Sequence, residues 1–338
     1  MKNRFIVFLS LLALASCASQ KDLSKANPTE FASSITSEEL KQHLYTFASD
    51  EFLGRETGEP GQKKAAKYLK TEYMSLNIPA LLGDENYYQE IPSSYFKNRF
   101  GDTENVVAFI KGRDYDSKQH EYLVISAHYD HEGVDEQGNI YNGADDDGSG
   151  TVAILEIAEA FKIAVEEGYR PKRSIIFMHF TGEEKGLLGS KYYTENPIVP
   201  LEETITNLNI DMVGRVDAKH KNNPNYVYLI GSDMLSTELH ELSEQANEKY
   251  VHLNLDYTYN GTDDPNRFYY RSDHYNFAKH GIPVIFYFNG VHEDYHKPTD
   301  TPDKINYDLL EKRAKLIFYT AWKVANGEHA PVVDKPVK

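Results

Sequence analysis

Three consecutive aspartates, Asp145, Asp146 and Asp147, stand between glycines in the segment YNGADDDGSG. Adjacent carboxylates repel one another, so three of them packed together without basic neighbours cost free energy unless a cation lies among them. Histidines, aspartates and glutamates also gather in other short segments, namely AHYDH, FTGEEKGLLGS, NIDMVG, RSDHYNF and YHKPTDT. Because imidazole and carboxylate together suit zinc, whereas calcium prefers oxygen ligands alone, these segments favour a zinc site.

The aspartate run also comes close to the calcium loop of an EF-hand, which would begin at Asp145 and close at Glu156. Such a loop should follow a helix, yet the preceding DEQGNIYNGA is typical of a loop. The sequence offers no partner for such a hand, and calcium would leave the histidines unexplained. We therefore rank the EF-hand interpretation below the zinc interpretation.

Other residues with reactive side chains give weaker evidence for a functional site. Ser272, Asp273 and His274 are adjacent in RSDHYNF, but the members of a nucleophilic triad converge in space and are rarely consecutive. We expect His274 to be structural or to line a cleft, and not to bind metal. Arg55, in FLGRETGEPG, is expected to fix its own loop by ion pairing. Cys17 is the only cysteine, so no thiol nucleophile lies deeper in the chain.

The segments that must position these residues predict strands alternating with helices from Ser37 onward. Continuous apolar runs predict strands at residues 105–111, 122–128, 173–180, 205–214, 226–231 and 282–288. Apolar residues at helical spacing predict helices at residues 37–49, 60–76, 150–168, 186–196, 232–250 and 306–327. Apolar strands separated by helices indicate a sheet covered on both faces. The predicted fold class is α/β, a single doubly wound domain with a mixed, mostly parallel central sheet flanked by helices.

Four predicted strands run into polar residues with possible chemistry. YLVISA is followed by HYDH, SIIFMHF by TGEEKG, ITNLNI by DMVG and, after a short loop, IPVIFYF by HEDYHKPTD. Ligands of such sheets bind just beyond the carboxyl ends of the strands. A single Glu or Asp at such a place would usually be structural, but four coincidences at one edge predict one convergent site.

The net charge and the N-terminal segment limit the possible binding partners and the location of the protein. The 338-residue chain carries a formal net charge of −16, which argues against nucleic acid as a partner, because nucleic acid is bound by basic surfaces. Lys2 and Arg4 precede the apolar run FIVFLSLLALA, which is too short to span a bilayer stably. The LASC that follows resembles the lipobox of bacterial lipoproteins. A plain signal peptide with an incidental cysteine is the alternative.

These signals predict the organisation of the whole chain. We expect a lipoprotein signal peptide at residues 1–16, a flexible polar tether at 17–36, a catalytic domain at 37–328 and a short tail at 329–338. With Cys17 lipidated, the protein would be exported and anchored to a membrane of the bacterial cell envelope, facing the periplasm or the cell surface. No transmembrane span is predicted in the mature chain.

In their order along the chain, AHYDH, GADDDGSG, FTGEEKGLLGS, NIDMVG, RSDHYNF and YHKPTDT resemble the motifs of the co-catalytic di-zinc exopeptidases. This family includes bacterial leucyl-type aminopeptidases, and its relatives include glutamate carboxypeptidase II, the glutaminyl cyclases and the transferrin receptor. The resemblance runs roughly from Ser37 to Gly327. It implies one doubly wound α/β domain of the zinc-aminopeptidase type and the activity of a metallo-exopeptidase.

The resemblance also implies a site for two zinc ions. His128 of HYD and Asp211 of NIDM would bind one zinc, and Glu184, the second glutamate of GEE, and His296 of DYHKP would bind the other. Asp146, the middle aspartate of the triplet, would bridge the two ions, since one carboxylate can span ions about 3.5–4 Å apart. A cis peptide bond after this aspartate is implied as well. Its two neighbours are expected to hold the turn by hydrogen bonds.

Three further residues take roles implied by the resemblance. Glu183, the first glutamate of GEE, would act as the general base for hydrolysis by a water held between the zinc ions. Asp130 would orient His128. Tyr295 would donate a hydrogen bond to the developing oxyanion, or else it lines the cleft wall as an ordinary aromatic residue.

The leading functional interpretation is an aminopeptidase that removes N-terminal residues from peptides with a free N-terminus. The second is a glutaminyl cyclase, an acyltransferase that works with one zinc on similar ligands, although GADDDGSG and FTGEEKGLLGS look more like the peptidases. A non-catalytic binding module ranks last, because such modules lose ligands and this sequence keeps them all. The sequence leaves open the preferred side chain, dipeptidase or carboxypeptidase specificity, and the oligomeric state.

Overall fold

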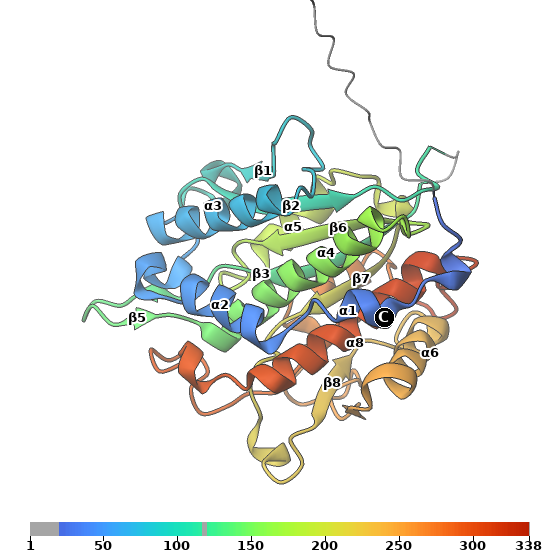
Figure 1. Cartoon of the computed structure of the whole chain (residues 1–338). Helices are drawn as coiled ribbons and strands as arrows, with labels where there is room; N and C mark the ends of the chain where they lie inside the picture. The colour runs from blue at the N-terminus through green and yellow to red at the C-terminus, as the bar shows by residue number, and fades with distance from the viewer. Residues whose placement is uncertain (1–19, 117–119, 338) are drawn as a thin grey trace, which may run out of the picture.

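One mixed sheet forms the centre of the molecule (Figure 1). The computed structural model describes residues 20–116 and 120–337, so Cys17 and the predicted signal peptide lie outside the described residues. In spatial order, the strands of this sheet are β1 (Tyr88–Ile91), β2 (Thr103–Ile110), β6 (Ser174–Phe180), β3 (Tyr122–His128), β7 (Thr204–Ile210), β10 (Val284–Phe288), β8 (Tyr226–Ile230) and β9 (Asn254–Asp256). A separate ribbon pairs β4 (Gly133–Val134) with β5 (Ile140–Tyr141).

The centre of the sheet is parallel and its flanks are antiparallel. β6, β3, β7 and β10 run parallel to one another. β2 pairs antiparallel with β6 and with β1, and β8 pairs antiparallel with β10 and parallel with β9. The parallel strands bring their carboxyl ends to one edge, where ligands bind in open α/β sheets. The predicted α/β fold with a mixed, mostly parallel sheet is confirmed.

Helices cover both faces of this sheet. The helices are α1 (Pro28–Ala32), α2 (Ser37–Phe47), α3 (Pro60–Ser75), α4 (Gly150–Glu166), α5 (Leu188–Glu195), α6 (Thr237–Ala246), α7 (His274–Ala278) and α8 (Tyr307–Asn326). α4 and α8 pack against β3 on the face turned toward the viewer in Figure 1. α5 and α7 pack against each other, and α7 also contacts β7 and β10.

The central strands are apolar on both faces because both faces are covered. In β3, Leu123 and Ile125 belong to the core shared with α4 and α8, whereas Tyr122 and Val124 belong to the core on the other side. All four side chains are buried. Burying an aliphatic side chain of this size contributes about 1.5–3 kcal/mol, and a shift by one residue would exchange the two sets. The apolar pattern therefore fixes the register that brings the strand ends together.

The described chain packs onto the domain earlier than the sequence predicts. Helix α1 begins at Pro28, and the side chain of Asn27 caps it. Phe31 is fully buried and lies against Trp322 of α8, with ring centroids 5.4 Å apart. The predicted tether at residues 17–36 therefore overlaps the folded domain. A helix this short shows too little periodicity to be recognised from sequence.

Capping side chains set where two of the longer helices begin. Helix α2 begins at Ser37, as predicted, and the Thr36 hydroxyl caps it by accepting a hydrogen bond from the backbone N–H of Glu39. Helix α6 begins only after Ser236, whose hydroxyl caps it in the same way. The predicted helix at 232–250 is therefore shorter at its N-terminal end, because a capping serine starts the helix later than the apolar pattern suggests.

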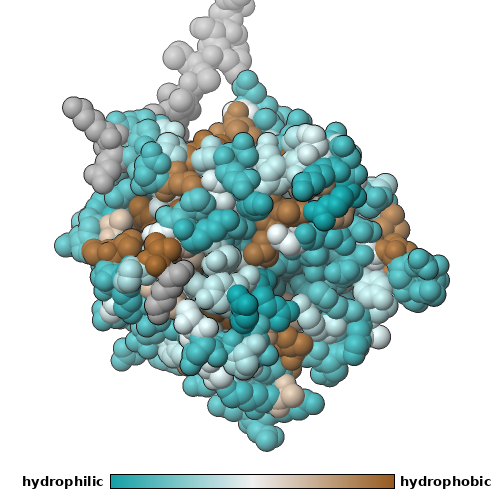
Figure 2. All heavy atoms as spheres, turned by 180° about the vertical axis from the view of Figure 1, so that it is seen from behind, coloured by the Kyte–Doolittle hydropathy of each residue, from teal (hydrophilic) through white to brown (hydrophobic). Residues whose placement is uncertain are grey.

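The face of the molecule seen in Figure 2 is mostly hydrophilic, with small apolar areas scattered over it. The C-terminal tail, residues 329–338, contributes exposed apolar side chains at Val332 and Val333. Within residues 20–116 and 120–337, none of the helices is both long enough and apolar enough to cross a membrane.

Candidate metal centre

Side chains from four strand ends meet in one cavity at the carboxyl edge of the sheet. His128 is the last residue of β3, Glu183 lies in the turn after β6, and Asp211 directly follows β7. His296 comes from the longer loop after β10. Together with Asp146, these residues line one cavity. The convergence predicted from the strand ends is therefore present.

Asp146 presents one carboxylate oxygen to each of two groups of candidate ligands. Its Oδ1 lies 3.2 Å from His128 Nε2, which is 3.7 Å from Asp211 Oδ1. Its Oδ2 lies 3.1 Å from His296 Nε2, which is 3.3 Å from Glu184 Oε2. One carboxylate thus faces two neighbouring donor sets, which is the arrangement that a ligand shared by two metal ions requires.

The polar atoms of these donor sets fit zinc. Among the described residues, Asp146 Oδ2 and Glu184 Oε1 are buried without a hydrogen-bond partner. Buried carboxylate oxygens are normally paired, hydrogen-bonded or bound to a metal, because leaving them otherwise costs several kcal/mol. Each set offers one imidazole nitrogen and carboxylate oxygens, which are ligands that zinc accepts and that a calcium site does not combine.

His131 is a candidate ligand that the sequence analysis did not single out. Its ring is fully buried, and its Nδ1 lies 2.8 Å from Glu184 Oε1 and 3.9 Å from Asp146 Oδ2. The contact with Glu184 is not aligned as a hydrogen bond, and neither ring nitrogen has a hydrogen-bond partner among the described residues. With these two carboxylates, His131 forms a group that could hold a metal ion. The sequence feature that could have indicated His131 is its position as the second histidine of AHYDH.

The aspartate triplet forms a tight turn immediately before α4. The peptide bond between Asp146 and Asp147 is cis, as the family resemblance implies. Gly150, at the start of α4, allows the chain to come close to this turn, since a Cβ atom there would lie 2.4 Å from Asp147 Oδ1 and 2.8 Å from the Ile210 carbonyl oxygen. Glycine is therefore required at position 150 by the close approach of the Asp147 carboxylate and the Ile210 carbonyl.

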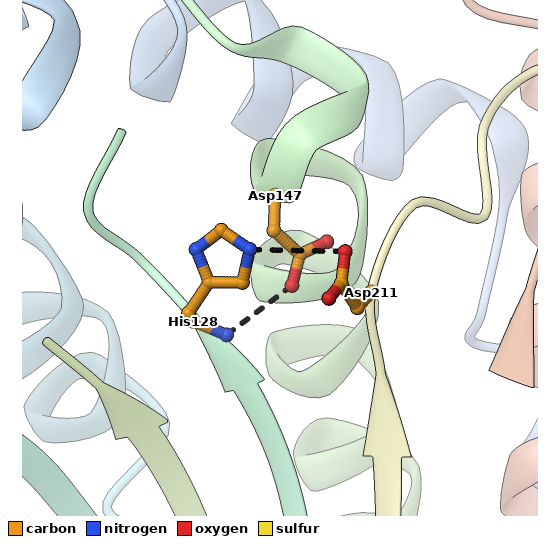
Figure 3. Close-up of side chains that lie close together, drawn as sticks. All are labelled: His128, Asp147 and Asp211. Atoms are coloured by element: carbon orange, nitrogen blue, oxygen red, sulfur yellow. Dashed lines mark hydrogen bonds and ion pairs between the residues drawn. The ribbon is translucent and has the colours of Figure 1, made fainter. Parts of the chain in front are cut away.

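Asp147 joins three segments that surround the site. Its Oδ2 accepts a hydrogen bond from the backbone N–H of His128 at 3.2 Å. Its Oδ1 accepts the backbone N–H groups of Gly150 and Met212, each at 3.0 Å. Figure 3 shows this carboxylate lying beside His128 and Asp211. Asp147 therefore supports the turn and its neighbours by hydrogen bonds, as predicted for an aspartate next to a bridging one.

Asp145 secures the other side of the turn. Its Oδ1 accepts the backbone N–H of Gly214 at 2.6 Å, and its Oδ2 lies 3.1 Å from Nε2 of the buried His292. Asp300 adds a second support, because its Oδ2 accepts the backbone N–H groups of Asp145 and Asp146 at 2.9 and 3.1 Å. The bridging candidate is thus held from both flanks.

Asp130 connects the candidate general base to the first donor set. Its Oδ1 accepts the backbone N–H of Glu183 at 3.1 Å, and its Oδ2 accepts the Thr57 hydroxyl at 2.8 Å. His128 Nδ1 lies closer to the backbone carbonyl oxygen of Asp130, at 3.1 Å, than to its carboxylate, at 3.8 Å. Asp130 therefore contacts His128 mainly through its backbone, and its carboxylate fixes the turn that carries Glu183.

Burial and neighbouring charges shift the pKa values in the cavity in opposite directions. Burial raises the pKa of Glu183 well above its ordinary value, although His128 works against it. Burial would also raise the pKa of Asp146, but contacts with His128 and His296 hold it well below its usual range. A carboxyl group with a raised pKa beside ionised groups in a cleft is typical of a general acid or base.

Tyr295 lies in the wall of the same cavity. Its ring stacks on that of His296, with centroids 3.9 Å apart. Its hydroxyl is 3.5 Å from the guanidinium of Arg271. The side chain therefore borders the donor sets, and its role as an oxyanion donor stays a prediction.

The remaining residues weighed in the sequence have structural contacts. The Ser272 hydroxyl donates to Asp211 Oδ2 at 2.6 Å and so orients a candidate ligand. His274 is buried and stacks on Phe286 at 4.8 Å, and burial lowers its pKa to about 3. Arg55 fixes its loop by donating hydrogen bonds to four backbone carbonyl oxygens, and not by the ion pairing that we expected.

The comparison with family models settles the relationship of this chain. Residues 105–321, more than half of the sequence, match the model of Peptidase family M28. The chain belongs to peptidase family M28. The matched residues include all the candidate ligands and Glu183, so this M28 chain carries the whole candidate site within the family region.

Curated relatives resemble this chain in sequence, and solved structures resemble it in fold. Aminopeptidase YwaD of Bacillus subtilis is 28% identical over 240 residues, which cover 69% of this M28 chain and 47% of YwaD. The chain spans about half the length of YwaD and of several other curated relatives. BSAP, a zinc aminopeptidase from Bacillus subtilis, has a TM-score of 0.67 at 18% identity, with 90% of this chain and 99% of that chain covered. A Bacteroides thetaiotaomicron glutaminyl cyclase bound to N-acetylhistamine has a TM-score of 0.66 at 17% identity, with 85% and 98% covered. At these identities the two structures show a shared fold alone.

Proposed function

We propose that this protein is a zinc-dependent aminopeptidase that hydrolyses the first peptide bond of peptides with a free N-terminus, using two zinc ions per chain. The observation that carries the proposal is the placement of Asp146, whose two oxygens face different donor sets. His128, Asp146 and Asp211 would hold one zinc, and Asp146, Glu184 and His296 would hold the other. Membership of a peptidase family and the aminopeptidases among the relatives support peptide hydrolysis.

The residues of the chain divide the work of hydrolysis. When bound, a pair of zinc ions would polarise the scissile carbonyl and lower the pKa of water at the site towards about 7. Glu183 borders the cavity, with its Oε2 3.9 Å from His128 Nε2, and neither donor set needs it. Its carboxylate is therefore free to take a proton from water and to pass it to the leaving amine. Tyr295, in the adjoining wall, would donate its hydroxyl proton in a hydrogen bond to the developing oxyanion.

The two adjacent glutamates give the sharpest test of this mechanism. Glu183→Gln keeps the size of the side chain and should retain both zinc ions, while kcat falls about 10²–10⁴-fold because the general base is lost. Glu184→Gln should lose occupancy of one zinc and recover part of its activity in excess zinc. Elemental analysis of zinc and hydrolysis of aminoacyl p-nitroanilides, measured side by side, check both expectations.

Two outcomes of this test would count against the mechanism. Loss of zinc from Glu183→Gln with full zinc in Glu184→Gln would reverse the assigned roles. Full activity in both variants would show that the catalytic site lies elsewhere. N-blocked peptides serve as the control for the substrate class, because an aminopeptidase should leave them intact.

A glutaminyl cyclase is the second candidate, and the fold shared with the Bacteroides cyclase favours keeping it. On a peptide with N-terminal glutamine, a cyclase closes a ring and releases ammonia, so the chain keeps all its residues. An aminopeptidase releases free glutamine and shortens the peptide by one residue. Mass spectrometry of one such peptide separates the two activities, and a non-catalytic module would produce neither change.

We also propose that the mature protein is a bacterial lipoprotein tethered to a membrane of the cell envelope through Cys17. The support is the LASC segment after a basic and apolar N-terminus. Several acyl chains would anchor the protein firmly, since each buried CH₂ adds about 0.8 kcal/mol. Peptides in the cell envelope would then be its substrates.

A further inference from the structure

One permanent cation stands among the side chains that line the candidate metal cavity. In the described part of the chain, Arg271 is the only lysine or arginine in this lining. Its guanidinium lies over the ring of Phe268, 5.1 Å from the ring centroid, and its side chain is exposed. A residue that is both exposed and part of the lining lies where the cavity opens to solvent.

This guanidinium is free to bind a ligand. No carboxylate within residues 20–116 and 120–337 forms an ion pair with it, and its polar contact in that part of the chain is the Tyr295 hydroxyl at 3.5 Å. That distance is longer than a normal hydrogen bond. Arg215 provides a contrast, because it is buried and pairs with Asp294 at 2.8 Å. Arg271 therefore keeps a fork of N–H donors whose geometry matches a carboxylate.

The rest of the cavity would surround the first residue of a substrate, and this step rests on the proposed aminopeptidase function. Only one residue precedes the scissile bond, and its carbonyl must reach the donor sets around Asp146. Its side chain then meets the remainder of the lining. Beyond the candidate ligands, that lining includes the apolar side chains of Met212, Phe268, Phe286, Phe288 and Val291. Methylene groups would pack on these walls, and a polar end would reach Arg271.

We propose that Arg271 binds a substrate carboxylate and so directs the enzyme to short peptides that carry one near the scissile bond. The carboxylate could be the side chain of an N-terminal glutamate or aspartate, or the free C-terminus of a dipeptide. Paired guanidinium and carboxylate groups make two parallel hydrogen bonds, which fix orientation as well as affinity. The cation is needed there, because the carboxylates of the cavity repel a further negative charge.

Paired substrates that differ only in one charge test the inference. The first arm compares glutamyl with glutaminyl p-nitroanilide, and the second compares leucylglycine with leucylglycinamide. Each pair is measured with the zinc-loaded full chain, with Arg271→Gln and with Arg271→Lys. Arg267→Gln is the matched control, because Arg267 is also exposed but lies over Tyr270 and does not line the cavity.

We expect kcat/KM of the wild-type enzyme to favour the charged member of one pair by on the order of 10–100-fold, as for a hydrogen bond to a charged group. Arg271→Gln should bring that ratio near one, Arg271→Lys should restore part of it, and Arg267→Gln should leave it unchanged. The arm that responds identifies the source of the carboxylate. Ratios near one in the wild type, or ratios unaffected by Arg271→Gln, would overturn the inference.

Binding measured without turnover keeps this inference separate from the proposed function. Calorimetric titration in the zinc-loaded Glu183→Gln background, where turnover is suppressed, uses the α-amides of glutamate and glutamine, leucylglycine and leucylglycinamide, and it reports carboxylate recognition directly. Weaker binding of the charged ligand by Arg271→Gln, with no hydrolysis of any substrate, would refute the aminopeptidase but keep the carboxylate site. Hydrolysis of leucyl p-nitroanilide with equal binding of charged and neutral ligands would keep the aminopeptidase and reject the carboxylate site.

Discussion

Replacing Asp147 with asparagine should damage the candidate metal centre, although Asp147 is not one of the ligands proposed above. The wild-type carboxylate accepts three backbone N–H groups, from His128, Gly150 and Met212. Because all three contacts are donors, the ionised carboxylate is the form that satisfies them, even though burial raises the pKa of Asp147 well above its usual value. Two of the segments that it joins carry candidate ligands, since His128 is one of them and Met212 directly follows Asp211.

The size of the effect follows from counting these donors. In Asp147→Asn the carbonyl oxygen can keep the contacts of Gly150 and Met212, but the amide NH₂ must then face the backbone N–H of His128. One hydrogen bond to a charged group, worth about 1.5–3 kcal/mol, is lost, and a buried donor is left without an acceptor. We expect the free energy of unfolding to fall by about 3 kcal/mol. Loosening the backbone of a ligand should weaken zinc binding by about 10–100-fold.

Two measurements on the same variant check this prediction. Denaturant unfolding of the chelator-treated protein gives the change in stability, and competition with a chromogenic chelator gives the affinity for zinc. Asp217→Asn is the control, because this buried aspartate accepts the backbone N–H of His220 and the Tyr228 hydroxyl, and no candidate ligand contacts it. The control should lose stability and keep its zinc affinity. If Asp147→Asn keeps wild-type stability and zinc affinity, the carboxylate does not organise the site.

Three further predictions test other parts of the chain. Asp146→Asn should weaken both zinc ions together, whereas two tightly held ions in elemental analysis would remove it from the bridging position. His131→Asn should weaken the zinc near Glu184 by about 10–100-fold and spare the other, as measured by stepwise zinc titration; equal loss of both ions, or of neither, would contradict the contact seen in the structure. Cys17→Ser should move the protein from the membrane to the soluble fraction on cell fractionation, and unchanged membrane association would reject lipidation.

The edge of the sheet that carries the candidate site could be predicted, because three of its residues follow recognisable apolar strands, whereas the role of each residue came from the family resemblance. His128, Glu183 and Asp211 come at or just after strands whose apolar runs are unmistakable, and parallel strands share one carboxyl edge. The supporting contacts could not be predicted in this way. Asp300 reaches the aspartate turn from a loop more than 150 residues away in the sequence. His131 was visible as a residue, but only the packing of its ring shows that it meets Glu184.

Short and peripheral elements escaped prediction for a different reason. Strands β1 and β9 and helix α1 are too short for a periodic pattern to stand out from chance. Their positions depend on long-range packing, as in the contact between Phe31 of α1 and Trp322 of α8. The same limit applies to Arg271, because nothing in RSDHYNF shows that its guanidinium has no carboxylate partner among the residues that the structure describes. Sequence patterns locate the donors of the site, whereas the surroundings that tune them depend on the three-dimensional structure.

The need for three adjacent aspartates becomes clear from the different partners of their side chains. Asp147 is satisfied by backbone N–H groups, and Asp145 by a backbone N–H group and His292. Those donors offset the repulsion between the adjacent carboxylates, which would otherwise destabilise the turn. Asp146 differs, because its carboxylate lies next to His128 and His296, and each of these histidines also faces a second carboxylate, that of Asp211 or Glu184. The outer aspartates are thus stabilised by hydrogen-bond donors of the protein itself, and the middle one faces the two donor sets that the proposed zinc ions would share.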